Sequence, residues 1–98
     1  MKRYRVAVAA VAESDIQDAV LWYGERNALM AEAFRVETLD AIERVVKSPL
    51  GKAADDEGNL RRVLRRFPYS VVYDIDGSTV RILAVTHHRR QPNYWRKG

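Results

Sequence analysis

The chain has 98 residues, 47% of them hydrophobic, and it contains no cysteine. That length suits one domain, so we expect residues 1–98 to form a single domain that needs no disulfide and fits a reducing compartment. The N-terminal apolar run alternates with arginine, which makes it a poor signal peptide. No stretch approaches the about 18 apolar residues of a membrane span. We therefore expect a soluble, cytoplasmic protein without a membrane partner.

The net charge of +4 is spread unevenly along the chain. Residues 1–58 carry eight Lys/Arg and eleven Asp/Glu, whereas residues 59–98 carry nine Lys/Arg and two Asp/Glu, a balance of +7. A cationic surface of this kind concentrates anionic partners, such as nucleic acid, a nucleoprotein machine or an acidic peptide. The alternative is a solvated surface whose charges happen to cluster.

The first half of the chain predicts one strand followed by two helices. Residues 3–10 alternate between apolar and other side chains, which is typical of a half-buried strand. Acidic and capping groups at residues 13–15 predict the start of a helix, and Asn27 is expected to end it. A second helix is expected from Leu29 to Lys47, where Ser-Pro-Leu-Gly ends it.

The second predicted helix has two apolar faces. Its main stripe suits packing on a sheet and consists of Met30, Phe34, Thr38, Ala41 and Val45. A very short turn between the helices predicts an antiparallel hairpin. If one helix face packs on a sheet, other apolar side chains of the two helices remain unexplained. These are expected to form the seam of the hairpin or a groove for a partner, and they are Leu21, Val36, Leu39 and Val46.

The second half of the chain predicts three successive strands, over Leu60–Phe67, Tyr69–Ile75 and Thr79–Thr86. Asp76-Gly77 is a strong hairpin signal between the last two. The last strand is the most uniformly apolar, so we expect it to be central. The order β-α-α-β-β-β indicates an α+β fold with two layers, in which the helical hairpin covers one face of an antiparallel meander.

The residue types offer little conventional catalytic chemistry. The lack of cysteine excludes thiol catalysis, and no serine lies in a nucleophile-elbow pattern. His87 and His88 are adjacent, so on a strand they point to opposite faces and cannot easily share a metal ion. There is no glycine-rich phosphate loop. The sequence therefore predicts neither a metal site nor a cofactor.

The basic C-terminal third suits either RNA phosphodiester cleavage or simple anion binding. A metal-free ribonuclease needs a base for the 2′-hydroxyl, cations for the developing charge and an acid for the leaving oxygen. Side chains of these types are present at Arg65, His88, Arg89, Arg90 and Tyr94. In the alternative interpretation, Tyr94 and Trp95 anchor the C-terminus by packing, and the arginines face solvent or carboxylates.

Four segments together resemble toxins of the RelE/ParE superfamily of type II toxin–antitoxin systems. They are WYGER in the first helix, SPLG after the second, LRRVLRRFPYSVVY, and AVTHHRRQPNYW. The resemblance implies the layout derived above, with the first strand beside the last. It also implies an acidic cognate antitoxin whose C-terminal segment wraps the toxin. The partner groove described above would then be an antitoxin-binding surface.

The superfamily divides by target, and this sequence combines features of both groups. RelE-like members cut mRNA in the ribosomal A site, whereas ParE-like members act on DNA gyrase. In the ribonucleases an arginine commonly follows the aromatic residue that opens the middle strand, but here Ser70 follows Tyr69. Their Lys/Glu-rich stretch before the meander is replaced by residues 53–56, AADD, although Tyr94 falls near the place of their C-terminal catalytic residue.

Because two of these three features are missing, we interpret the chain as a ParE-like toxin that binds its target. The target-binding residues would be Arg61, Arg62, Arg65, Arg89, Arg90, Tyr94 and Trp95. One alternative is a ribosome-dependent mRNA endonuclease that uses Arg65, His88, Arg89 and Tyr94. Another is an inactive module that only binds its antitoxin.

Overall fold

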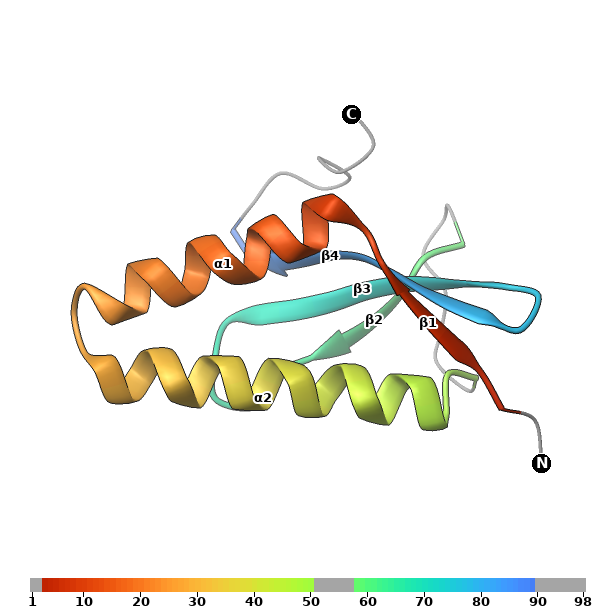
Figure 1. The fold of residues 1–98 in the computed structure, drawn as a ribbon, viewed down its shortest axis with the longest axis horizontal. Coiled ribbons are helices and arrows are strands. Elements are labelled where there is room, and N and C mark those ends of the chain that lie inside the picture. The colour runs from red at the N-terminus through yellow and green to blue at the C-terminus, as the bar shows by residue number, and fades with distance from the viewer. Residues whose placement is uncertain (1–2, 51–57, 90–98) are drawn as a thin grey trace.

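A four-stranded sheet with a helical hairpin on one face makes up the fold, seen in a computed structural model that describes residues 3–50 and 58–89 (Figure 1). The predicted order β-α-α-β-β-β is confirmed. The elements are β1 (Arg5–Val8), α1 (Ala10–Gly24), α2 (Ala28–Lys47), β2 (Leu60–Val63), β3 (Tyr69–Asp76) and β4 (Thr79–His87).

The strands lie in the order β1-β4-β3-β2, so β4 is central, as its apolar sequence predicts. β1 runs parallel to β4, and the other pairs are antiparallel. The hairpin between β3 and β4 closes where Asp76 pairs with Thr79. Gly77 in this turn has a φ of 61°, a left-handed conformation that glycine adopts without a side-chain clash.

The core lies between the helical hairpin and the two central strands. The predicted stripe on α2 is buried at Phe34, Thr38, Ala41 and Val45, but Met30 at its N-terminal end remains 42% exposed. From the sheet, the core receives the side chains of Val71, Tyr73, Val80, Ile82 and Val85. The 3.6-residue period of α2 therefore identifies the face that packs on the sheet.

Two strands differ from their prediction. All four residues of β1 are exposed, so the half-buried pattern is wrong there, because β1 is an edge strand and the helices pack mainly over β3 and β4. β2 ends at Val63 rather than at Phe67. Beyond it the chain turns, and the turn is closed by the Leu64 amide, which donates to the Tyr69 carbonyl at 2.9 Å.

The helix boundaries also differ, because the capping groups act elsewhere. α1 begins at Ala10, and Ala9 in the cap position provides no side-chain hydrogen bond. Asp15, expected near the helix start as a capping group, is instead buried against the sheet. Asn27 does not end α1 but caps α2, where its Oδ1 accepts a hydrogen bond from the Leu29 amide at 2.9 Å.

Tyr73 ties the end of the helical layer to the sheet. Its side chain is 1% exposed, and its hydroxyl donates to the Pro49 carbonyl at 3.0 Å, just after α2. Burial raises the pKa of this hydroxyl. The hydrogen bond therefore joins the chain that leaves α2 to the centre of β3.

We expect Tyr73→Phe to lower the free energy of unfolding by about 1 kcal/mol, because it leaves the Pro49 carbonyl without its donor. Urea denaturation followed by circular dichroism measures the change. Tyr23→Phe is the matched control, since no hydrogen bond from the Tyr23 hydroxyl is found within the described ranges. If the two variants lose equal stability, the Tyr73 hydrogen bond is not what stabilises this junction.

Candidate functional site

The predicted catalytic residues that the structure describes lie at one end of the sheet. Arg65 lies in the turn between β2 and β3, and His88 and Arg89 directly follow β4. The two segments are joined, because the His88 amide donates to the Pro68 carbonyl at 2.9 Å. The other predicted target-binding residues at the C-terminus, Arg90, Tyr94 and Trp95, lie outside the described residues.

Glu37 of α2 anchors the turn that carries Arg65. Its Oε2 accepts hydrogen bonds from the amides of Arg65 and Arg66, and its Oε1 accepts one from the Arg66 Nε at 3.3 Å. A groove of about 410 Å³ lies here between α2 and β2. Arg62 and Arg65 are among the residues that line it. No sequence pattern predicts this role of Glu37, because its partners are 28 and 29 residues away.

His88 makes a structural hydrogen bond. Its Nε2 lies 3.0 Å from the Oγ of Ser70, whose side chain is 2% exposed. His87 points to the opposite face of the sheet and packs edge-on against Tyr69, with ring centroids 5.1 Å apart. Within residues 3–50 and 58–89, no side-chain hydrogen bond joins Arg65, His88 and Arg89, and no three potential metal ligands cluster. The described residues of the predicted catalytic set thus lie at one end of the sheet, but no side-chain hydrogen bond connects them.

Many of the cations are paired with nearby carboxylates. Arg81 binds Asp74 on the neighbouring strand through two hydrogen bonds of 2.7 and 2.5 Å, which raise the pKa of the Arg81 guanidinium. The exposed cations of α2 pair along the helix, in Arg35–Glu32, Arg44–Asp40 and Lys47–Glu43. In the part of the chain that the structure describes, no ion pair is found for Arg61, Arg62, Arg65 or Arg89. These four leave positive charge on β2 and at the end of β4.

The apolar residues assigned to a hairpin seam or an antitoxin groove are mostly exposed. Leu21 is 60% exposed, Val36 50% and Leu39 48%, whereas Val46 is half-buried and packs against the core. Leu21 lies over the outer seam where α1 meets the start of α2, and Val36 lines the groove beside β2. Three of the four therefore remain accessible to a partner.

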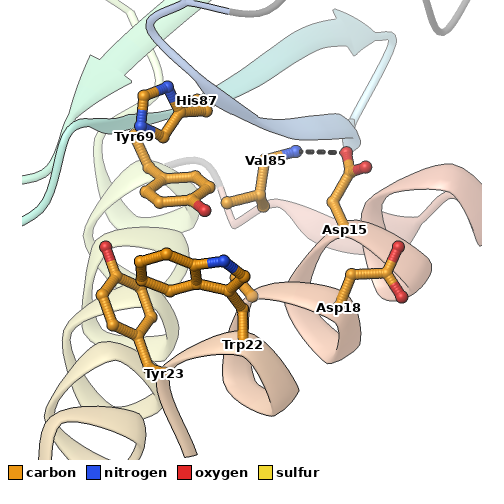
Figure 2. A pocket seen from close by; sticks show the side chains of 8 residues that line it. Asp15, Asp18, Trp22, Tyr23, Tyr69, Val85 and His87 are labelled. Atoms are coloured by element: carbon orange, nitrogen blue, oxygen red, sulfur yellow. Dashed lines mark hydrogen bonds between the residues drawn. The ribbon is translucent and has the colours of Figure 1, made fainter. Parts of the chain in front are cut away.

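A second cleft, which the sequence analysis did not identify, lies between α1 and the ends of β3 and β4 (Figure 2). It has a volume of about 370 Å³. Aromatic and acidic side chains dominate its lining: Asp15, Asp18, Trp22, Tyr23, Tyr69 and His87. Asp15, Asp18 and Trp22 recur at intervals of three and four residues, so the helical period could have placed them on one face.

Asp15 links α1 to the central strand at this cleft. Its side chain is 6% exposed, and its Oδ2 accepts a hydrogen bond from the Val85 amide at 3.0 Å. The aromatic rings continue from the cleft into the core, where Tyr23 stacks on Phe34 with centroids 5.5 Å apart. Asp15 and the aromatic rings thus hold α1 against the sheet.

Neither helix of the described ranges is long and apolar enough to cross a membrane.

Comparison with known proteins identifies the family through one match and the fold through another. Residues 6–92 match the family described as "ParE toxin of type II toxin-antitoxin system, parDE". The fold is similar to that of the chromosomal ParDE toxin–antitoxin system from P. aeruginosa, with a TM-score of 0.77 and 16% identity over 86% of this chain and 95% of the other.

A second solved structure, the toxin–antitoxin complex RelBE2 from Mycobacterium tuberculosis, matches with a TM-score of 0.53 and 25% identity. The match covers 87% of this chain and 98% of that one. No curated protein matches the sequence.

We expect Asp15→Ala to lower the free energy of unfolding by about 1–3 kcal/mol, because the Val85 amide would lose its acceptor in a buried place. Asp18→Ala is the control. Asp18 is an exposed carboxylate on the same helix, and its loss should change stability by about 0.5 kcal/mol or less. Thermal unfolding of both variants measures the difference, and equal losses would contradict a structural role for the Asp15 hydrogen bond.

Proposed function

The chain belongs to the ParE toxin family of type II toxin–antitoxin systems, and we propose that it inhibits growth by binding DNA gyrase rather than by cutting RNA. In this proposal its C-terminal cations hold the target, and a cognate antitoxin neutralises it by covering the helical hairpin and the basic groove. The gyrase target is that of the ParE-like members of the superfamily.

The Ser70–His88 pair is the observation that carries this proposal. Ribonucleases of the superfamily commonly have an arginine where this chain has Ser70, a buried residue whose Oγ contacts the Nε2 of His88 at 3.0 Å. A general base must reach the proton that it removes within hydrogen-bond distance. Because the Nε2 of His88 is engaged by a buried serine, the arrangement supports binding over cleavage.

The unpaired arginines supply the binding chemistry. Guanidinium groups without a carboxylate partner remain available for phosphates or acidic side chains. Arg62 and Arg65 line the groove beside α2, whereas Arg61 lies on the opposite face of β2, because successive residues of a strand alternate in direction. Arg89 adds positive charge directly after β4. Arg90, Tyr94 and Trp95 would continue it in the target-binding set.

Two features support antitoxin binding on the helical side of the molecule. Leu21, Val36 and Leu39 are each about half exposed or more, which is unfavourable unless a partner covers them. The adjacent basic groove would attract acidic residues of the same partner. We assign the antitoxin-binding role to these three residues together with Val46.

The purified protein should stop gyrase from supercoiling relaxed plasmid, as seen on agarose gels. In parallel, primer extension on mRNA from a translating extract should show no new ends. New ends at A-site codons with intact supercoiling would support the endonuclease alternative instead. If neither activity is found while antitoxin binding persists, the chain is an inactive antitoxin-binding module.

Tyr94→Phe should remain toxic, because it keeps the aromatic ring and removes only the hydroxyl. In an endonuclease that uses Tyr94 as an acid or base, the same change would cost about 10²–10⁴-fold in rate. Growth inhibition after induced expression is the measurement, with protein levels compared by immunoblot. Abolished toxicity at an equal protein level would contradict the binding role of Tyr94.

Association with the antitoxin should be driven by charge, so its rate should fall by about tenfold or more between low and high salt. Arg62→Ala combined with Arg65→Ala should slow association and weaken its salt dependence. The backbone bond of residue 65 to Glu37 survives that change. The control is Arg35→Ala with Lys47→Ala, which removes the same charge from residues that are already paired on α2 and do not line the groove. Equal effects of the two double variants in stopped-flow measurements would exclude the groove as the docking surface.

A further inference from the structure

The cleft between α1 and the ends of β3 and β4 has a charge opposite to that of the protein as a whole. The chain carries a net charge of +4, yet the charged groups that line this cleft are the carboxylates of Asp15 and Asp18. Its remaining walls are mostly aromatic rings, with His87 at the sheet end. This combination is unlike the arginine-lined groove beside α2.

The two carboxylates lie near each other on α1. Residues three apart on a helix are neighbours, and like charges at this spacing repel each other. Figure 2 shows both side chains rising from α1 on the side of β4, where the Asp15 Oδ2 meets the Val85 amide. Asp18 is exposed, and within residues 3–50 and 58–89 no ion pair is found for it. A cation that entered the cleft would therefore meet the exposed carboxylate of Asp18.

The aromatic walls also favour a cation. Trp22 stands on the α1 side of the cleft and Tyr69 on the sheet side, as Figure 2 shows, and the half-exposed Trp22 ring can accept a cation over its face. The Trp22 ring already does so once. The guanidinium of Arg26, which does not line the cleft, lies 3.6 Å from the ring centroid, and its Nη1 donates to the Trp22 carbonyl at 2.7 Å.

We propose that this cleft binds an arginine side chain of a protein partner. A guanidinium is flat enough to stack on Trp22 and presents several N–H donors that the Asp18 carboxylate can accept in pairs. A nucleic acid is disfavoured, because two carboxylates repel its phosphates. The inference does not depend on gyrase being the target, since it rests only on the geometry and charge of the cleft.

Arginine amide is the probe for this chemistry, and citrulline amide is its neutral analogue of nearly the same shape. In ¹H–¹⁵N spectra of the full chain, arginine amide should shift the indole N–H of Trp22 and the amide of Val85 with one saturable affinity. The Trp22→Phe variant identifies the indole signal against that of Trp95. Citrulline amide at the same concentrations should produce no comparable shift.

Asp18→Asn should weaken arginine amide binding by about fivefold, because it removes one partly exposed carboxylate from the site. Glu13→Gln is the matched control, an equal loss of charge on the same helix outside the cleft, and it should leave the affinity within about twofold. If both variants weaken binding equally, arginine is attracted only by the general acidity of α1, and the proposal is wrong.

One further variant tests whether the occupant belongs to the same molecule. The chain has basic residues of its own beyond residue 89, at Arg90, Arg96 and Lys97. If replacement of these three by glutamine shifts the Trp22 indole signal without added ligand, the chain's own C-terminal cations occupy the cleft and a partner arginine is excluded. An unchanged Trp22 signal, with arginine amide binding retained, supports a cleft open to a partner.

Discussion

Two different groups bind the backbone of β4 on the side away from β3, first the strand β1 and then the side chain of Asp15. β1 pairs with β4 as far as Ile82, whose carbonyl accepts the Ala9 amide at 2.9 Å. The chain then enters α1, and the Asp15 carboxylate accepts the next available donor, the Val85 amide. A register shift against β3 leaves Leu83 as an extra residue between these two positions. Asp15 therefore extends the edge contact where β1 has ended, and in doing so it fixes α1 over the sheet and forms one end of the acidic cleft.

Acidic and basic residues, which are spread unevenly along the sequence, also lie in different parts of the structure. The exposed cations of α2 are each paired with a carboxylate three or four residues away, and such exposed pairs add only a few tenths of a kcal/mol each. Their main effect is to reduce the field around α2. The excess of acid remains on α1, and the excess of arginine remains on β2 and at the end of β4. The cleft beside α1 and the groove beside α2 thus differ in the sign of their charge, although the same hairpin borders both.

The elements could be predicted from the sequence because burial repeats with the period of a helix or a strand. The α2 stripe at Phe34 and Val45 and the central position of β4 follow directly from that rule. The predicted boundaries of the elements were wrong where a side chain binds a backbone group far away in the sequence. Asp15 looks like a capping residue, but its partner Val85 is 70 residues away, and Glu37 reaches a turn 28 residues away. No local preference encodes these contacts.

The candidate sites could likewise be predicted only where residue type and strand order were enough. Arginine and histidine could be identified by residue type, and their shared location at one end of the sheet follows from the strand order. The Ser70–His88 contact could not be predicted, since it requires the register of β3 against β4 and the chain's path after β4. The acidic cleft needs the same information, because Tyr69 and His87 come from those strands whereas Asp18 and Trp22 come from α1.

Opposite charges on the two sides of the hairpin have a consequence for any partner that contacts both. Such a partner would best present acidic groups to Arg62 and Arg65 and a cation to Asp18. In the reverse orientation every one of these contacts would bring like charges together, and such juxtapositions cost several kcal/mol when they are desolvated. An all-acidic segment would meet repulsion at the cleft lined by Trp22, and an all-basic one at the groove between α2 and β2. Electrostatics would therefore set the direction in which the proposed partner segment crosses the hairpin, while the exposed apolar residues Leu21, Val36 and Leu39 would add affinity without a preferred direction.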